Sequence, residues 1–426
     1  MKAAPFPKMK QRIVLVVAFA SCGIAPSVAP LLLDPGDSWL MAHRGEWRGS
    51  LTGHTETADN QQAQGNTSPE SFDKLRERAR EAMDADRVPE AIRLYTRATA
   101  LEPNWSEGWW HLGTLLFDAR RFTQARDAFQ HFVLVEREQR GPGFGMLGLS
   151  EFQLKHYRKA LTALEHGRTL GLGSDQPFLA TVLLHEGILN TLFGKPEIAL
   201  QRLTLAANQI AAAHPDAPKS AVFADLELLD ALGIAALRIP KLPSSLTAAQ
   251  MPLVRQAGRA QALIALQDRV TAETEFNQLL AQYPSEPGVH YMHGVFLLKE
   301  HPPLAVDEFR REIEVSPSHD AARIQLALEL LRTADYDEGL KYAREAVRLA
   351  PGNFVAHVAC GRLWLALGKT DRALSELRTA VKLAPGSPDA HFALSQALSE
   401  AGRSRESRHE RAEFERLEKL VDRPDR

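Results

Sequence analysis

The sequence is poor in cysteine and has no excess of charge of one sign. Its 426 residues include only Cys22 and Cys360. Because Cys22 falls in a predicted N-terminal signal, no disulfide is expected within the folded chain. The formal net charge is −2, from 51 basic and 53 acidic residues, which predicts no broad attraction to nucleic acid or to anionic lipid. What is present is an ordinary globular composition, 44% hydrophobic and 24% charged, so burial of a large core must hold the chain together.

Recognisable catalytic motifs are also missing: there is no G-x-S-x-G, Walker or Cys/His nucleophile arrangement. Residues 143–148 fit G-x-G-x-x-G, but no strand precedes them as a dinucleotide site requires, and 141–143 read as a turn between structural units. His290 and His293 are three residues apart on a predicted helix, yet no third metal ligand is apparent nearby. Cys360, at an apolar position, is predicted to be a buried, unreactive thiol. We therefore expect no catalytic residue, no metal and no cofactor.

Residues 1–30 have the pattern of an export signal or a membrane anchor. Four basic residues precede the apolar run 13–20, as in the first two regions of a signal peptide. Residues 19–23, Phe-Ala-Ser-Cys-Gly, resemble a bacterial lipoprotein lipobox with Phe where Leu is usual, which makes Cys22 a candidate for lipidation. Cleavage after Ala29 and an uncleaved anchor that reaches Leu33 are the alternatives. The chain is therefore expected to be exported, and to be periplasmic, secreted or membrane-anchored.

Residues 31–70 are predicted to be a disordered linker. Most of this tract is rich in Thr, Asn, Gln and Gly and has few aliphatic residues, so it cannot bury enough apolar surface to offset the entropy lost on ordering. At its end, Ser68 is a predicted helix N-cap, followed by Pro69 at the first helical position and Glu70 in the first turn. The folded part is thus expected to begin close to residue 71.

The rest of the chain follows a fixed period of about 34 residues, a length typical of stacked repeats, and the pattern is clearest over 320–391. The first copy of the pattern there consists of Ala327, Tyr336, Ala346 and Pro351. The second copy, one period later, consists of Gly361, Thr370, Ala380 and Pro385. Such a period predicts supersecondary units that stack and bury their apolar faces against one another.

The pattern resembles the tetratricopeptide repeat, whose units are two antiparallel helices with small residues at positions 8, 20 and 27 and Pro at position 32. This resemblance implies an all-α fold, a right-handed α-solenoid of antiparallel helix pairs with about eight to nine units. An N-terminal array is expected over 71–213 and a C-terminal array over 253–421, ending in a polar capping helix, with a tail at 422–426. The histidines at position 4 are expected to be partly buried packing residues: His290, His357 and His391.

Residues 214–252 interrupt the period. They contain one apolar helical run, from Ala221 to about Ile239. Pro240 must end this run, because proline removes a backbone donor and clashes inside a helix. We predict an irregular helix and loop here, separating the two arrays.

The resemblance also implies a binding surface, because in this family the first helix of each unit lines the concave side. Helical spacing places positions 5 and 9 opposite the packing face. The candidate partner-binding residues at these positions are Arg76, Arg80, Trp110, Gln261, Tyr291, Ile324, Arg362 and Phe392. Arginine and aromatic residues are enriched in binding hot spots, although Trp110 and Tyr291 are equally suited to packing between units. The Lys/Asn pattern of the carboxylate-clamp members of the family is absent.

These features predict a non-enzymatic scaffold that binds protein or peptide partners, and no nucleic acid, in a concave groove. A bacterial cell envelope is the expected setting, with membrane attachment through the N-terminus as an option. Two alternatives stay open. One is an enzyme or enzyme subunit with its site in 214–252, which offers His214, Asp216 and Asp225. The other is a purely structural, membrane-tethered spacer.

Overall fold

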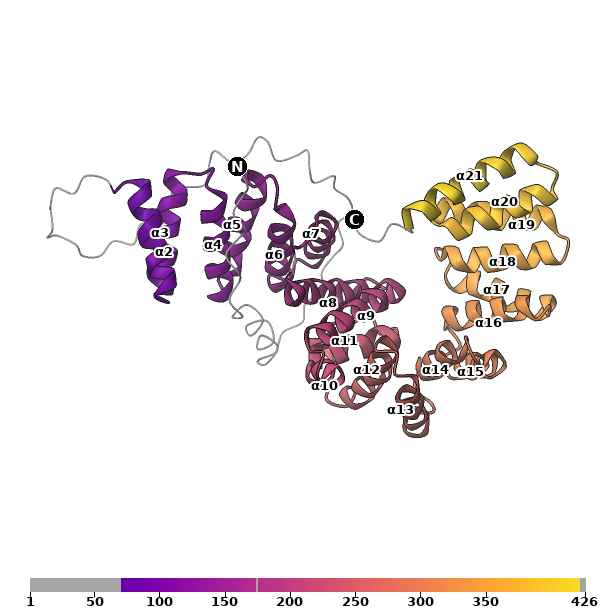
Figure 1. The fold of residues 1–426 in the computed structure, drawn as a ribbon. Coiled ribbons are helices and arrows are strands. Elements are labelled where there is room, and N and C mark those ends of the chain that lie inside the picture. Colours follow the sequence, from indigo (N-terminus) through magenta and orange to yellow (C-terminus); the bar gives the residue numbers. More distant parts are fainter. Residues whose placement is uncertain (1–69, 174, 422–426) are drawn as a thin grey trace. The chain divides into compact units, whose positions relative to one another are not determined.

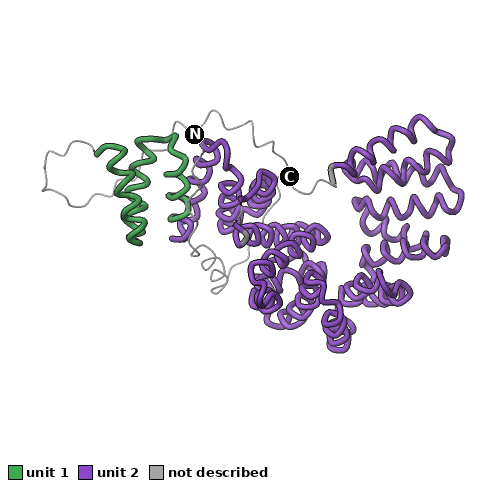
Figure 2. Tube along the Cα trace, in the orientation of Figure 1, with its two compact units in different colours: residues 1–115 green, residues 116–426 purple. Residues whose placement is uncertain are grey.

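The computed structural model describes residues 70–173 and 175–421. The chain divides into two units, residues 1–115 and 116–426 (Figure 2). The predicted signal with Cys22, the tail at 422–426 and nearly all of the linker lie outside the described residues. Within the described part, no helix combines the length and the apolar character that crossing a membrane requires.

All regular elements in the described residues are helical (Figure 1). The first unit holds α2 (Phe72–Asp84), α3 (Val88–Leu101) and most of α4 (Ser106–Asp118). The second unit continues with α5 (Phe122–Val135), α6 (Arg140–Gln153), α7 (Tyr157–Leu170), α8 (Gln176–Leu192), α9 (Pro196–Ala213), α10 (Pro218–Ala224), α11 (Leu226–Ala236), η1 (Pro243–Ser245), α12 (Met251–Ala265) and α13 (Arg269–Gln282). It ends with α14 (Val289–Leu297), α15 (Pro302–Val315), α16 (Asp320–Arg332), α17 (Tyr336–Leu349), α18 (Phe354–Ala366), α19 (Thr370–Leu383), α20 (Pro388–Glu400) and α21 (Ser404–Val421).

The predicted repeat units each form two helices, which confirms the expected all-α fold of antiparallel helix pairs. We call the first helix of a unit its A helix and the second its B helix. The A helices are α2, α4, α6, α8, α12, α14, α16, α18 and α20. Small residues permit the close approach of A and B helices: in α2 and α3, Ala79, Ala91 and Ala98 have no exposed surface. The aromatic residue at position 24, Tyr95, is also fully buried. The repeat register read from the sequence is therefore the register of the core.

Most A helices end in the same way. In α2, for example, the N–H of Arg87 donates to the carbonyl of Ala82 at 2.8 Å, across a residue in the left-handed region, Asp86 (φ 57°). This is a Schellman motif, which satisfies the last carbonyls of a helix. The left-handed residues at the ends of the other A helices are Arg120, Lys155, Gly194, Gln267, Ala334, Gly368 and Gly402. Only α14, whose unit is one residue shorter, lacks such a residue among the described A helices.

The single helical run predicted over 221–239 is in fact two helices, α10 and α11. The side chain of Asp225 accepts a hydrogen bond from the backbone N–H of Leu228 at 3.0 Å and so starts a new helix there. The helix α11 then ends like an A helix, with Arg238 in the left-handed region (φ 57°) and Ile239 N–H bonded to Ile234 O. However, no B helix follows it; residues 237–250 contain only the short η1. The sequence missed this division because Asp225 lies within an otherwise apolar run.

The helix α11 packs against α12, the A helix of the next unit, at very short range. A Cβ atom at Gly233 would lie 1.9 Å from the carbonyl oxygen of Val254, and one at Gly258 would lie 2.0 Å from that of Leu229. The earlier residue of α11, Leu229, contacts the later residue of α12, Gly258, and the later residue Gly233 contacts the earlier Val254. The two helices therefore run antiparallel. Buried residues of α8, α9, α10, α11 and α12 form one cluster, and residues of α11 and α12 also belong to the next cluster along the chain. Apolar packing is therefore continuous through 214–252.

A second correction concerns residues 141–143, which were expected to form a turn. They lie instead in the first turns of α6, which begins at Arg140. Proline is tolerated in the first turn of a helix, where its missing N–H has no partner to lose. The flanking glycines lie against other segments: a Cβ at Gly141 would lie 1.8 Å from the carbonyl oxygen of Gly171, just after α7, and one at Gly143 would lie 2.3 Å from the Phe132 ring of α5. The other two glycines of the G-x-G-x-x-G match pack as closely, since a Cβ at Gly145 would lie 2.7 Å from Phe178 and one at Gly148 would lie 2.6 Å from Leu164. All three glycines of the match are thus helix-packing residues.

The start of the folded part also differs slightly from its prediction. The helix α2 begins at Phe72, after Ser71 in an extended conformation (ψ 154°), and Ser68 and Pro69 lie outside the described residues. Glu70 is not in the first turn but precedes the helix, where its carboxylate pairs with Arg78 at 2.5 Å and with Arg97 at 3.4 Å. Through these two ion pairs, Glu70 contacts both α2 and α3 from the segment that precedes α2.

The close packing at position 8 supports a first prediction. A Cβ added at Gly361 would lie 2.5 Å from Cγ of Leu377 and 3.3 Å from the carbonyl oxygen of Ala373. Gly361→Leu is therefore expected to lower the free energy of unfolding by about 1–3 kcal/mol through overpacking. Urea unfolding followed by circular dichroism measures this loss. An unchanged midpoint would show that α18 and α19 do not pack in this register.

Candidate functional site

The candidate residues of the first unit take part in local contacts. Nη2 of Arg80 on α2 donates to both carboxylate oxygens of Glu107 on α4, at 2.8 and 2.9 Å. The His111 ring and the Arg80 guanidinium lower the pKa of the Glu107 carboxyl to about 2, against the opposing effect of burial. Arg76 pairs with Asp73 at 3.1 Å, and Trp110 is half-buried on α4. Arg80 therefore joins two successive A helices.

Tyr291 lies in a polar cluster of the second unit. Its ring is 4.7 Å from that of His319, and the Arg238 guanidinium lies 5.6 Å from the ring centroid. Burial raises the pKa of Tyr291 to about 12. Arg238 also pairs with Glu197 of α9. Tyr291 thus connects α14 to the end of α11, and the contact to Glu197 extends this connection to α9.

The same cluster caps two helices. The buried carboxylate of Glu312 accepts hydrogen bonds from the backbone N–H groups of Gly288 at 2.8 Å and Tyr291 at 3.2 Å. Nδ1 of His319 accepts from Ala322 N–H at 3.1 Å at the start of α16. Burial is the main cause that lowers the pKa of His319 to about 4 and raises that of Glu312. A neutral ring is required for this cap, because a protonated Nδ1 could not accept.

The remaining candidates differ in exposure. Phe392 packs on Phe414 of α21 at 5.2 Å between ring centroids, beneath the guanidinium of Arg411. Ile324 is 4% exposed, and Gln261 is half-buried. Arg362 is exposed on α18. The structure therefore does not gather the candidates into one cluster; it places most of them in separate contacts along the A helices.

Position 9 of the A helices is the more accessible of the two candidate positions in the last units. Val295 of α14 is 43% exposed, and Arg362 of α18 and Gln396 of α20 are also exposed. At position 5, by contrast, Ile324 and Val358 are only 4% and 6% exposed. Residues that a partner could reach on these helices therefore lie mainly at position 9.

The position-4 histidines are buried, as expected, and each has two hydrogen-bond partners. His290, His357 and His391 are 6–7% exposed. Each ring contacts a glutamate of the B helix in its own unit and a proline carbonyl that ends the preceding unit. The glutamates, which sequence reasoning missed, are Glu308, Glu376 and Glu410. Their recurrence at nearly the same interval after each histidine was the available signal.

The buried thiol of Cys360 is confirmed. Cys360 is 1% exposed, and burial raises its pKa to about 12. A thiolate is the reactive form of cysteine, so this environment makes the side chain inert.

Residues 214–252 do not bring their titratable candidates together in a recognisable catalytic arrangement. Asp225 caps α11, whereas His214 and Asp216 are exposed. Burial, with the negative charges of Asp225 and Asp230, raises the pKa of Glu227 to about 7. Among the described residues, no group of three or more His, Cys, Asp or Glu side chains is arranged to hold a metal ion.

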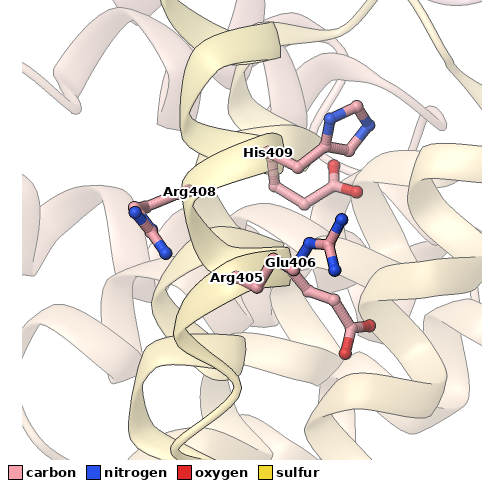
Figure 3. A pocket seen from close by; sticks show the side chains of 5 residues that line it. Arg405, Glu406, Arg408 and His409 are labelled. Atoms are coloured by element: carbon pink, nitrogen blue, oxygen red, sulfur yellow. The ribbon is translucent and has the colours of Figure 1, made fainter.

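A shallow depression on α21 is also a poor candidate. It is lined by Arg405, Glu406, Arg408, His409 and Glu410. Figure 3 shows the side chains of the four labelled residues on the same helix. One helix supplies the whole lining, with charges of both signs, and Glu410 is already held by His391. A lining from a single helix does not form an enclosed binding site.

Comparison with known proteins identifies the repeat. The tetratricopeptide repeat model matches residues 76–139 and 359–416. Comparison with curated proteins finds no match. Similar solved structures include MamA, residues 41 to the end, from Desulfovibrio magneticus RS-1, with 17% identity over 40% of this chain and 97% of that chain and a TM-score of 0.36. Yeast Tom70 is 13% identical over 81% of this chain and 92% of that chain, with a TM-score of 0.34. Likenesses this low carry no argument about function.

Proposed function

We propose that this chain, which the tetratricopeptide repeat model matches over residues 76–139 and 359–416, is a non-enzymatic scaffold that holds a protein or peptide partner along its A helices. The observation that carries the proposal is the exposure of position 9 in α14, α18 and α20, where Val295, Arg362 and Gln396 are accessible. An apolar, a cationic and an amide side chain on three of the last four A helices offer a partner both apolar contact and hydrogen bonding.

The proposed setting is a bacterial cell envelope. It rests on the basic and apolar pattern of residues 1–30 and on the lipobox-like residues around Cys22. The mass of the mature N-terminus, measured for the natural chain and for Cys22→Ser, distinguishes lipidation from simple cleavage. A full-length, unmodified N-terminus in the cytosolic fraction would contradict export.

The scaffold proposal is tested with two matched sets of substitutions. The first is Val295→Asp, Arg362→Asp and Gln396→Asp on the A helices. The second makes the same three chemical changes at exposed positions of the B helices α13 and α17: Val270→Asp, Arg348→Asp and Gln278→Asp. Both sets should fold as the natural chain does, because all six side chains are accessible.

Cross-linking and co-purification from the native envelope should then recover partners with the natural chain and with the B-helix set. Recovery should fall at least about tenfold with the A-helix set, which corresponds to about 1.4 kcal/mol of binding free energy. Equal recovery from both sets would reject the A helices as the binding surface. A failure of all three chains to retain any partner would favour the alternative of a structural spacer.

A further inference from the structure

We propose that protonation of His290 locks neighbouring repeats together around α14, so that this part of the chain loosens as the medium becomes alkaline. His290 stands at position 4 of the A helix α14, and His357 and His391 occupy the same position in α18 and α20. The proposal is independent of which partner the chain binds.

The contacts of the three rings are nearly identical. Nδ1 lies 2.6, 2.7 and 2.6 Å from a carboxylate oxygen of Glu308, Glu376 and Glu410, respectively. Nε2 lies 3.0 Å from the carbonyl oxygens of Pro284, Pro351 and Pro385. An ionised carboxylate and a carbonyl can only accept hydrogen bonds. A neutral imidazole has one N–H and can satisfy one of these contacts, whereas an imidazolium has two and satisfies both.

Each ring thereby joins three segments. The proline carbonyl belongs to the turn that ends the preceding unit, the histidine belongs to the A helix, and the glutamate belongs to the B helix of the same unit. Because the rings are 6–7% exposed, water cannot readily replace a lost partner, and a buried group without its partner is costly. The loss of one proton therefore weakens a contact within a unit or one between units.

The charged groups around His290 favour its protonated form. On α15 these are Glu308 and, one turn further, Glu312; Arg311 holds the other oxygen of Glu308 at 2.9 Å. On its own helix, His293 lies 3.6 Å from Glu308. The hydrogen bond to Glu308 raises the pKa of His290, against the opposing effect of burial. Burial tends to raise the pKa of Glu308, but hydrogen bonds from His290 and His293 outweigh it and lower that pKa to about 2.

The other two rings make the same contacts. His357 faces Glu376 of α19 at 2.7 Å, and His391 faces Glu410 of α21 at 2.6 Å. In both cases the nearest charge is a carboxylate.

The chain contains two natural counterparts of this contact that do not titrate near neutral pH. At position 4 of α16, Nε of Arg323 pairs with Glu345 at 3.0 Å and its Nη1 donates to the carbonyl of His319 at 3.2 Å. At position 4 of α4, Nε1 of Trp109 donates to the carbonyl of Pro103 at 2.9 Å. These residues keep their N–H donors at every physiological pH. They provide internal references for His290.

The direction of the pH effect follows from the raised pKa of His290. A group whose pKa is higher in the folded state than its unfolded value of 6.5 contributes its full stabilisation below that value. The contribution is lost as pH rises through the folded pKa. The partner Glu308 has a lowered pKa, so its contribution is present above its unfolded value of 4.5 and is lost as pH falls toward about 2. The His290 contact is therefore complete in mildly acidic medium.

Hydrogen exchange of the full chain, monitored by mass spectrometry between pH 6 and pH 9, tests the proposal. After correction for the intrinsic pH dependence of exchange, peptides from α14 should lose protection as pH rises through the raised pKa of His290. Peptides from α16, which Arg323 holds, should change much less. Equal behaviour of α14 and α16 would overturn the proposal, whether both helices lost protection or neither did.

Two variants separate this effect from general destabilisation. His290→Arg copies Arg323 and should keep α14 protected at pH 9. His290→Gln is uncharged at every pH and should show low, pH-independent protection of α14. A single substitution is used so that the remaining units preserve the fold. A pH response of α14 that persists in both variants would assign the effect to other groups and reject the proposal.

Discussion

A chain with Gly258→Leu is expected to lose about 3 kcal/mol or more of its free energy of unfolding, the upper end of the usual range for overpacking. The reason is that a Cβ at this position would lie 2.0 Å from the carbonyl oxygen of Leu229 and 2.8 Å from its carbonyl carbon. A flexible side chain could move away from such a contact, but backbone atoms of a packed helix cannot move without shifting α11. Even the single methyl group of Gly258→Ala meets the same obstacle.

Urea unfolding, monitored by circular dichroism, measures this loss. Gly352→Leu and Gly386→Leu are the controls, because a Cβ at either position has no neighbour within 4 Å. Both controls should unfold close to the natural chain. If Gly258→Leu matched them, α11 and α12 would not be in contact, and 214–252 would be a true interruption of the packing.

Replacing Glu186 by alanine is expected to destabilise the chain by about 3–5 kcal/mol, the usual result of breaking a buried ion pair from one side. Glu186 on α8 has no exposed side-chain surface, and its oxygens lie 3.0 Å from Nε of Arg168 on α7 and 3.0 Å from Nε of Arg202 on α9. Burial raises the pKa of Glu186, and both guanidiniums oppose that rise. Without the carboxylate, two partly buried positive charges would face each other.

Thermal unfolding of Glu186→Ala measures this effect, and Glu406→Ala is the matched control. Glu406 pairs with Arg403 at 2.6 Å, but about half of its side chain is exposed, so its removal should cost less than about 1 kcal/mol. A triple variant, Glu186→Met with Arg168→Met and Arg202→Leu, removes all three charges and should recover most of the stability. If Glu186→Ala were as mild as the control, the three charges would not act as a buried group.

The regular part of the fold could be predicted from the sequence because the small residues that let helices pack closely recur at fixed positions. Ala346 and Ala380 stand one period apart, and both are fully buried at position 27 of their units. A residue type repeated at a fixed interval identifies both the helix and the face that packs. This argument succeeds wherever a unit has a neighbour of the same kind.

It fails for α11, because α11 has no matching B helix and so no second position against which a period could be counted. The glycines that join it to α12, Gly233 and Gly258, are not one period apart in the sequence, so no repeat pattern links them. The cluster around Tyr291 was hidden for a related reason. Its partner Arg238 follows the end of α11, and Glu197, which pairs with Arg238, lies on α9. No periodic rule states which distant side chain will cover a given ring.

The candidate surface was predictable only in outline. The repeat register correctly assigns each residue to a position of its helix, but exposure depends on the neighbouring helix. At position 5, for example, Tyr291 meets His319 and Phe392 meets Phe414. These contacts come from the loop before α16 and from α21. The type of residue at a position therefore indicates what it could bind, while tertiary packing decides whether a partner can reach it.

The contact between α11 and α12 breaks the regular alternation of A and B helices. Elsewhere A and B helices alternate along the chain, whereas here two helices that both end like A helices are adjacent and antiparallel. Whole repeat units can be added or removed on either side of this contact without changing the order of A and B helices, because each unit brings one helix of each kind. Removal of α11 alone would change which helix faces α12. Gains and losses of complete repeat units are therefore the length changes that this architecture accommodates, whereas α11 cannot be removed by itself.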